Sequence, residues 1–176
     1  MDQRSIIEPA KRPPLLAALH WTTAAVLLVG VAAILARELV EAKTGRASLL
    51  EVHRWCGVLI LVLTTLRLLL RAWSAPLPDL LPHRPARSRL VASAAHMALY
   101  AFLVALPVLG WWSLATNDED LGERLHDWHV ALAFTFIGLI AIHAAAACWH
   151  QFIRREPVVR AMWPWPSFIQ KRGDTP

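Results

Sequence analysis

The chain has 176 residues, of which 56% are apolar and only 18% are charged. A soluble domain of this length would be nearer half apolar, with about a quarter of its residues charged. The composition therefore excludes an ordinary soluble domain and predicts a membrane protein, folded as a single domain over residues 1–176.

Four long apolar runs follow one another along the chain, over residues 15–36, 51–73, 90–114 and 128–152. Each is long enough to cross a hydrocarbon core, which takes about 20 residues of helix. The first is too long for the apolar part of a signal peptide, and Arg37 and Glu38 follow it without a small-residue cleavage site. The pattern predicts an all-α protein, a four-helix bundle integral to the membrane.

Charge is distributed unevenly around these runs. Basic residues gather in the N-terminal tail, the second connection and the C-terminal tail: Arg4, Lys11, Arg12, Arg84, Arg87, Arg89, Arg154, Arg155, Arg160, Lys171 and Arg172. The third connection, residues 115–127, is acidic. Because basic segments stay in the cytoplasm, both termini and the second connection are expected on the cytoplasmic side. The membrane is expected to be the inner membrane of a bacterium. This asymmetry accounts for most of the net charge of +5, so no nucleic-acid partner is expected.

Histidines are the most informative residues of the apolar runs. Six of the eight lie within the runs or at their ends: His20, His53, His96, His129, His143 and His150. Ionisable groups are costly inside a bilayer, so each is a candidate for function. A single one could be a neutral ring bonded to a neighbouring backbone or hydroxyl group, but six together favour a shared role.

Two histidines of the fourth run share one helical face. His129 and His143 lie fourteen residues apart, which is about 40° short of four full turns and a rise of about 21 Å. His53 opens the second run at the depth of His129. His20 lies in the half of the first run that matches His143. The spacing predicts two cross-helix pairs at two depths of the bundle core: His53 with His129, and His20 with His143.

Two histidines at one depth suit the two axial positions of a haem iron better than a zinc site, which usually gathers three or four ligands. Small residues at Gly57, Gly138 and 144–147 are expected to leave room for a flat macrocycle, although they also serve helix packing. No Cys-x-x-Cys-His motif is present, so covalent c-type haem is excluded. Cys56 and Cys148 lie at distant depths, and no disulfide between them is expected.

Three arginines are candidates for binding the propionates of such haems through charge-assisted hydrogen bonds. Arg67 lies fourteen residues after His53 and so shares its inward face near the cytoplasmic end. Arg71 lies one turn further, where the alternative is a side chain that reaches to lipid headgroups. Arg54, beside His53, is placed for the periplasmic level.

A set of short motifs occurs in order along the chain: Leu19-His20-Trp21, His53-x-x-Cys56-Gly57, Arg67-Leu-Leu-Leu-Arg71, His96 followed by Ala105-Leu-Pro-Val-Leu-Gly110, Trp128-His129, and His143-Ala-Ala-Ala-Ala followed by His150. This ordered set resembles the bacterial cytochrome b-561 family. It is most similar to the branch whose best-known member is a superoxide:ubiquinone oxidoreductase. The resemblance covers roughly residues 15 to 164.

The resemblance implies four transmembrane helices and two non-covalent haems b, whose iron ligands fall on His20, His53, His129 and His143. It further implies oxidation of superoxide at the periplasmic side and reduction of ubiquinone. His96 is then a residue beside the ligands, a quinone-site residue, or a core histidine whose hydrogen bonds are made within the protein. His150 is the main rival ligand, and otherwise a candidate for quinone contact.

The acidic third connection departs from the superoxide-handling relatives, which attract their anionic substrate with positive charge. Its carboxylates would repel superoxide unless nearby basic residues dominate at the haem edge: Arg37, Lys43, Arg46, Arg54 and Arg124. The same scaffold also serves as a cytochrome b subunit that docks a separate dehydrogenase or hydrogenase, and the acidic connection would then bind a basic partner. Transport of divalent metals by the histidines is a third, more distant alternative.

Overall fold

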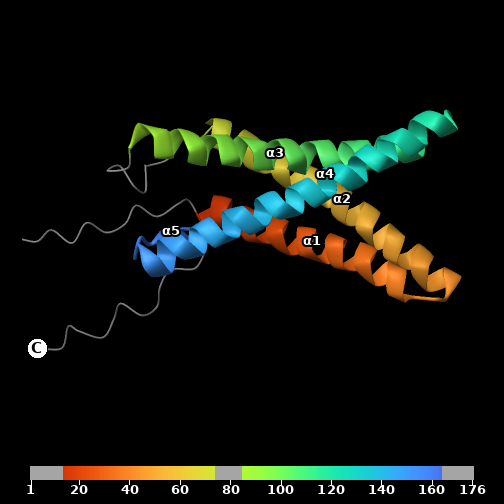
Figure 1. Ribbon diagram of the computed structural model, residues 1–176, viewed down its shortest axis with the longest axis horizontal. Coiled ribbons are helices and arrows are strands. Elements are labelled where there is room, and N and C mark those ends of the chain that lie inside the picture. Colours follow the sequence, from red (N-terminus) through yellow and green to blue (C-terminus); the bar gives the residue numbers. More distant parts are fainter. Residues whose placement is uncertain (1–13, 74–84, 164–176) are drawn as a thin grey trace, which may run out of the picture.

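The computed structural model describes residues 14–73 and 85–163, and Figure 1 shows a bundle of long helices. Four helices have the length and hydropathy to cross a membrane: α1 (Pro14–Leu39), α2 (Lys43–Trp73), α3 (Ala86–Ala115) and α4 (Glu119–Cys148). A π-helical turn, η1 (Trp149–Ile153), continues α4, and the short helix α5 (Val158–Ala161) follows. The described part of the chain contains no strand. The all-α, four-helix membrane fold is therefore confirmed.

Helices α2 and α4 begin well before the apolar runs that predicted them. At α4, the Asp118 side chain caps the helix by accepting a hydrogen bond from the Leu121 backbone N–H. Glu119 and Asp120 occupy the first turn, where the helix dipole favours negative charge. The third connection predicted over 115–127 is therefore wrong in extent, because most of its carboxylates lie on the first turns of α4.

The second connection is likewise shorter than predicted, since Arg87 and Arg89 lie in the first turn of α3. Several of the basic residues behind the topology prediction fall outside the described residues: Arg4, Lys11, Arg12, Arg84, Lys171 and Arg172. The side of the membrane that each terminus faces stays a prediction.

The helices form two antiparallel hairpins, α1 with α2 and α3 with α4, which meet where α2 packs against α3 (Figure 1). No Cα atom of α4 lies within 8 Å of a Cα atom of α1 or α2. Helix α4 therefore faces α1 and α2 through side chains rather than through close backbone packing.

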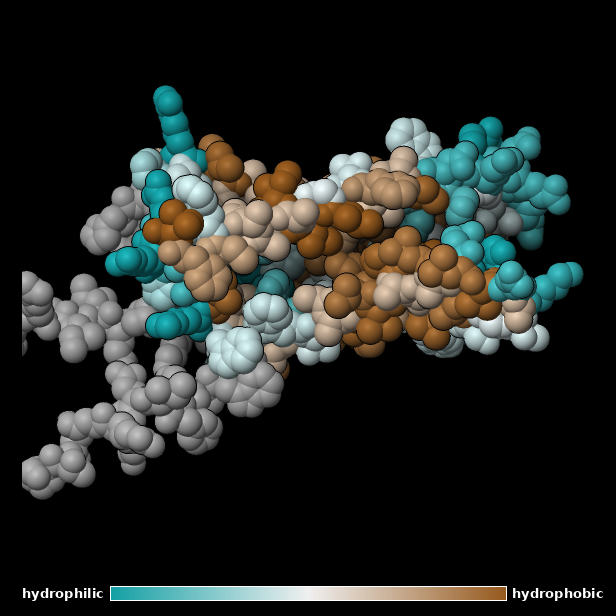
Figure 2. All heavy atoms as spheres, turned by 60° about the horizontal axis from the view of Figure 1, so that its bottom comes forward, coloured by the Kyte–Doolittle hydropathy of each residue, from teal (hydrophilic) through white to brown (hydrophobic). Residues whose placement is uncertain are grey.

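On the face that Figure 2 shows, apolar side chains gather along the middle of the bundle, and hydrophilic side chains gather toward its two ends. Large apolar side chains of the bundle are exposed, such as Leu28, Phe134 and Ile142, as expected for a surface that faces lipid. We call the end that carries residues 40–42 and 116–118 the connection end, and the end that carries residues 14 and 163 the terminal end.

Candidate haem sites

His53 of α2 and His129 of α4 face each other toward the connection end, and we call them the connection-end pair. Their ring centroids are 6.1 Å apart and their planes are inclined by 87°. Two imidazoles that each place a nitrogen about 2 Å from a shared metal have centroids roughly 6 Å apart. The separation of these rings therefore fits one iron between them.

Backbone carbonyls orient both rings of this pair. The Nδ1 atom of His53 donates to the carbonyl oxygen of Gly30, and Nδ1 of His129 donates to that of Leu106, each at 2.9 Å. A carbonyl oxygen only accepts, so the ring proton lies on Nδ1 and the Nε2 lone pair stays free. Metal-binding histidines commonly have such an acceptor behind the ring.

Two glycines allow the close packing behind these rings. A Cβ at Gly110 of α3 would lie 3.1 Å from two ring atoms of His129, and a Cβ at Gly30 of α1 would lie 3.0 Å from Cys56 Cβ. The glycines singled out in the sequence have other surroundings. Gly57 faces Pro107 of α3, and Gly138 is exposed with open space around it, on the side of α4 opposite to His129. Gly138 therefore does not border the face that carries His129, whereas the interpretation of Gly57 as room for a macrocycle stays a prediction.

His20 of α1 and His143 of α4 form the terminal-end pair. Their ring centroids are 6.5 Å apart and their planes are inclined by 71°, so their separation also fits one shared iron. A third ring, that of His96 from α3, lies 5.4 Å from His143. His96 is exposed and its Nδ1 donates to the Ala92 carbonyl oxygen at 2.7 Å, and the choice among its three predicted roles stays open.

The hydrogen bond behind His20 has the opposite sense to those of the connection-end pair. Arg67 Nη1 lies 3.0 Å from His20 Nδ1, and a guanidinium can only donate, so Nδ1 accepts. The guanidinium also lies 5.6 Å from the centroid of the Tyr100 ring, a cation–π contact. Iron at Nε2 of a neutral His20 requires the ring proton on Nδ1, so Arg67 would then donate to another acceptor.

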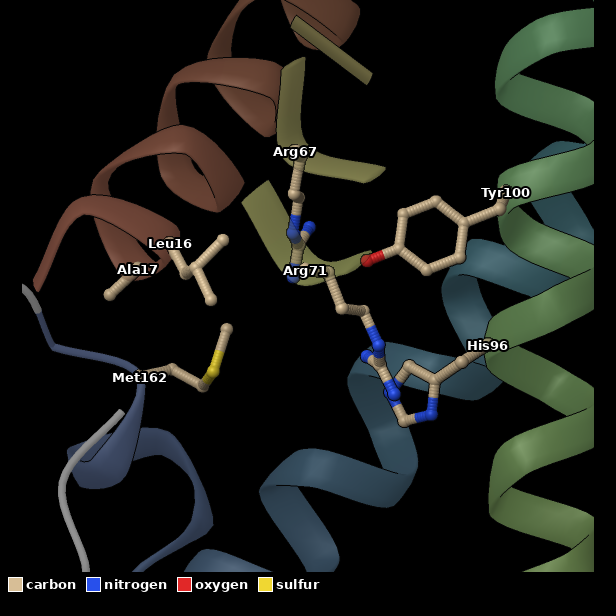
Figure 3. Close-up of a pocket in the computed structure, with 7 residues that line it drawn as sticks. All are labelled: Leu16, Ala17, Arg67, Arg71, His96, Tyr100 and Met162. Carbon is tan, nitrogen blue, oxygen red and sulfur yellow. The ribbon is translucent and has the colours of Figure 1, made fainter. Parts of the chain in front are cut away.

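A pocket of about 120 Å³ opens beside this pair (Figure 3). Its lining combines cationic and polar side chains with an apolar wall: Arg67, Arg71, His96, Tyr100, Leu16, Ala17 and Met162. Met162 is held in place because its carbonyl oxygen accepts a hydrogen bond from Trp21 Nε1 at 2.8 Å. Two of the arginines predicted to bind propionates, Arg67 and Arg71, therefore share one pocket with His96.

His150, the rival ligand, lies in the π-helical turn η1 rather than in α4. Its Nδ1 is 2.7 Å from the Glu156 carboxylate, whereas the ring centroid of His143 lies 6.5 Å from that of His20. A π-helical turn also breaks the periodicity on which the match between His150 and His143 depended. The geometry thus favours His143 as the ligand.

Arginines at the connection end are held by glutamates. Arg54 pairs with Glu51, Arg37 pairs with Glu38 at 2.9 Å, and Arg46 also approaches Glu38, at 3.7 Å. The Nε atoms of Arg37 and Arg54 are buried without a hydrogen-bond partner. Arg54, predicted to bind a propionate beside His53, thus has an Nε–H left to donate to that propionate. Arg37 also has such an Nε–H, although the sequence analysis did not predict it to bind a propionate.

Phe136 separates the two levels on α4 and was also missed in the sequence. It lies seven residues from both His129 and His143, and thus on their face of the helix. The side chain is only 3% exposed and stacks on Phe102 of α3, with centroids 5.4 Å apart and planes inclined by 16°. An apolar residue at such a spacing is expected in any helix core, so its position carries no functional signal in the sequence.

The sequence of the chain is similar to those of several known proteins. Residues 11–165 match the family model described as prokaryotic cytochrome b561. The chain is 29% identical to cytochrome b561 homolog 2 of Escherichia coli (strain K12), covering 64% of this chain and 69% of that protein. It is 27% identical to cytochrome b561 homolog 1 of the same organism, with 83% and 93% covered. It is 24% identical to the probable superoxide oxidase CybB of Yersinia pestis, with 88% and 94% covered.

Proposed function

The chain belongs to the prokaryotic cytochrome b561 family, and from this premise we propose that it moves electrons across the membrane between two haems b, from superoxide to ubiquinone. Membership makes it a haem-binding, electron-transferring cytochrome with several membrane spans, located in the bacterial inner membrane. The number of haems, their ligands and the two substrates belong to the proposal.

The observation that carries the proposal is the presence of two histidine pairs at two levels, with ring separations of 6.1 and 6.5 Å. His53 and His129 would hold one haem, and His20 and His143 the other. A bound haem supplies reversible exchange of one electron, and its axial histidines fix its position and tune its potential. The levels are about 21 Å apart along α4, so the pairs lie toward opposite faces of the membrane.

Arginines have two roles in the proposal. Arg54 at the connection end, and Arg67 and Arg71 at the terminal end, would bind haem propionates. The positive-inside bias assigns the connection end to the periplasm. There Arg37, Arg46 and Arg54 would raise the local concentration of a small anion such as superoxide.

The pocket at the terminal end supports the ubiquinone half of the proposal. Two superoxide ions, one quinone and two protons give two molecules of O2 and one quinol, so the quinone site needs a proton donor. His96 and Tyr100 line the pocket, and so does Met162. His150 precedes Met162 by twelve residues in the sequence. Histidine can transfer protons near neutral pH, so we assign His96 and His150 to proton delivery at the quinone site.

One observation favours a second candidate function, a cytochrome b subunit that docks a separate dehydrogenase or hydrogenase. Five exposed carboxylates lie in and just before the first turns of α4 at the connection end: Asp118, Glu119, Asp120, Glu123 and Asp127. They would attract a basic partner protein and repel superoxide.

Haem reduction by superoxide distinguishes the two functions. Purified protein is mixed with an enzymatic source of superoxide and a soluble quinone, and haem reduction and quinol formation are followed by absorbance. The proposal predicts fast reduction that superoxide dismutase abolishes and that added salt slows steeply. Arg54→Gln should slow it, whereas Arg87→Gln, at the opposite end, should not. Negligible reduction by superoxide, with rapid reduction by a co-purifying dehydrogenase, would favour the second candidate.

Reporter fusions test the assignment of sides. A reporter that is active only in the periplasm should be active when fused after Asn117, which lies in the connection between α3 and α4. The same reporter fused after Arg172 should be silent. The reverse pattern would exchange the two sides of the membrane throughout the proposal.

A further inference from the structure

We infer that Arg67 makes the terminal-end haem the stronger electron acceptor of the two, so that an electron entering at the connection end comes to rest at the terminal end. The inference rests on the proposed function, which supplies two haems and a direction of flow, and adds the order of their potentials and the residue that sets it.

The first argument is the contrast in what lies behind the ligand rings. At the connection end, both rings donate to carbonyl oxygens, from Gly30 and Leu106. A ring that donates to an acceptor is a more basic ligand and stabilises oxidised iron. At the terminal end, the Nη1 atom of Arg67 lies 3.0 Å from the ring of His20. Iron at Nε2 of His20 would make Arg67 donate to another acceptor, but its guanidinium stays a permanent positive charge beside the site, which favours the iron state with one charge fewer, the reduced state.

The second argument is the difference in charge compensation. The connection-end arginines Arg37 and Arg54 are each paired with a glutamate, which offsets part of their positive charge. Neither Arg67 nor Arg71 forms an ion pair with a carboxylate among the residues that the structure describes. The terminal-end site therefore carries more uncompensated positive charge, even if each haem brings the same two propionates.

Burial increases the effect of Arg67. Its half-buried side chain lies 3.0 Å from His20 Nδ1 and 5.6 Å from the centroid of the Tyr100 ring, toward which it points in Figure 3. Coulomb interactions are several times stronger in such surroundings than in water. The exposed carboxylates of α4 act in the same direction by making the connection end more negative, but solvent and salt screen them. Arg67 is thus expected to contribute most of the difference.

Equilibrium redox titration of single-haem variants tests the inference without superoxide or quinone. His129→Ala should leave only the terminal-end haem, and His143→Ala only the connection-end haem. We expect the equilibrium constant for reduction to be at least tenfold larger for the haem that His129→Ala retains, a midpoint difference of about 59 mV or more for one electron. His53→Ala and His20→Ala provide independent versions of the same comparison.

The role of Arg67 is tested in the His129→Ala background. Arg67→Gln keeps a hydrogen-bond donor but removes the charge, and should lower the reduction constant about tenfold, or about 59 mV. Arg67→Lys should restore most of it. Arg87→Gln removes a positive charge at the same end of the molecule from the exposed start of α3, and should change it by less than about twofold.

The outcomes separate this inference from the proposed function. If the wild-type protein binds a single haem, the proposed function fails. If it binds two but the His143→Ala chain holds the higher-potential haem, or Arg67→Gln raises the potential, the inference is overturned and the proposed function stands. If Arg67→Gln fails to retain haem, the ranking of the two single-haem chains decides alone.

Discussion

The connection-end and terminal-end pairs hold the same two kinds of ring at similar separations, yet their surroundings differ. His53 and His129 each have a backbone carbonyl behind the ring, and glycines allow these contacts. His20 has an arginine behind it, and His143 has a third histidine beside it. The first pair is fixed by backbone, whereas the second is surrounded by side chains that carry charge and protons.

This difference teaches how one scaffold can assign two tasks to one cofactor. A site fixed by carbonyls is suited to rapid exchange of single electrons, because nothing around it must move or titrate. A site with Arg67, Arg71, His96 and Tyr100 around a pocket is suited to holding an electron while a second substrate takes up protons. The following predictions test this contrast.

Removing ligands should have the largest effect. His53→Ala or His129→Ala is expected to abolish the connection-end haem, and His20→Ala or His143→Ala the terminal-end haem, because one imidazole does not complete a low-spin site. Haem content per chain, measured after extraction, should fall from two to one in each variant. The pairing is wrong if His150→Ala removes a haem while His143→Ala does not.

A methyl group behind His129 should have a smaller effect, confined to one site. In Gly110→Ala the new Cβ would lie 3.1 Å from the His129 ring, so the ring must shift and its iron bond weakens. We expect about 10- to 100-fold weaker binding of the connection-end haem, as for lost support of a metal ligand, with the terminal-end haem unchanged.

Gly138→Ala is the matched control on α4, since a Cβ there meets no atom within 4 Å. Haem titrations of both variants should show two bound haems for Gly138→Ala at concentrations where Gly110→Ala has lost one. Equal haem loss in the two variants would show that helix stability, rather than ring position, explains the effect.

His96 should matter for turnover but not for haem content. His96→Ala keeps the His20–His143 pair intact, so both haems should remain and absorb normally. Quinol formation should slow by about tenfold or more, the contribution typical of a positioned acid or base. Stopped-flow reduction of the haems by superoxide should be unaffected. A variant that loses one haem would make His96 a ligand instead.

Charges on the first turns of α4 should have the smallest effect. Glu123 and Asp127 are exposed, so the double substitution Glu123→Gln and Asp127→Asn removes two charges whose electric field is already screened by solvent and salt. Reduction by superoxide should become faster by less than about threefold at physiological salt, and the difference should vanish at high salt. A slower reaction would indicate that these carboxylates bind an electron-donating protein.

Much of the site could be predicted from the sequence because it depends on helical periodicity and membrane depth. The fourteen-residue spacing of His129 and His143, with the depths of His53 and His20, predicts two pairs of rings, and the ring centroids of these pairs lie 6.1 and 6.5 Å apart. Apolar runs located the four spans but not the ends of α2 and α4, since polar first turns continue the helices beyond the hydrocarbon.

The remaining features depend on contacts between helices that periodicity does not encode. Gly30 and Gly110 matter because of which atoms they meet on neighbouring helices, and Gly57 and Gly138 could not be distinguished from them by residue type. The contact of Arg67 with His20 joins residues forty-seven positions apart. The π-helical turn at His150 breaks the spacing that had made it a rival ligand.

The most direct test of the central claim is the amount of haem per chain in the purified wild-type protein, measured with its reduced-minus-oxidised spectrum. Two histidine pairs at two levels predict two non-covalent, low-spin haems b per chain. A single haem, or a high-spin spectrum that indicates an iron with only one histidine ligand, would contradict the claim.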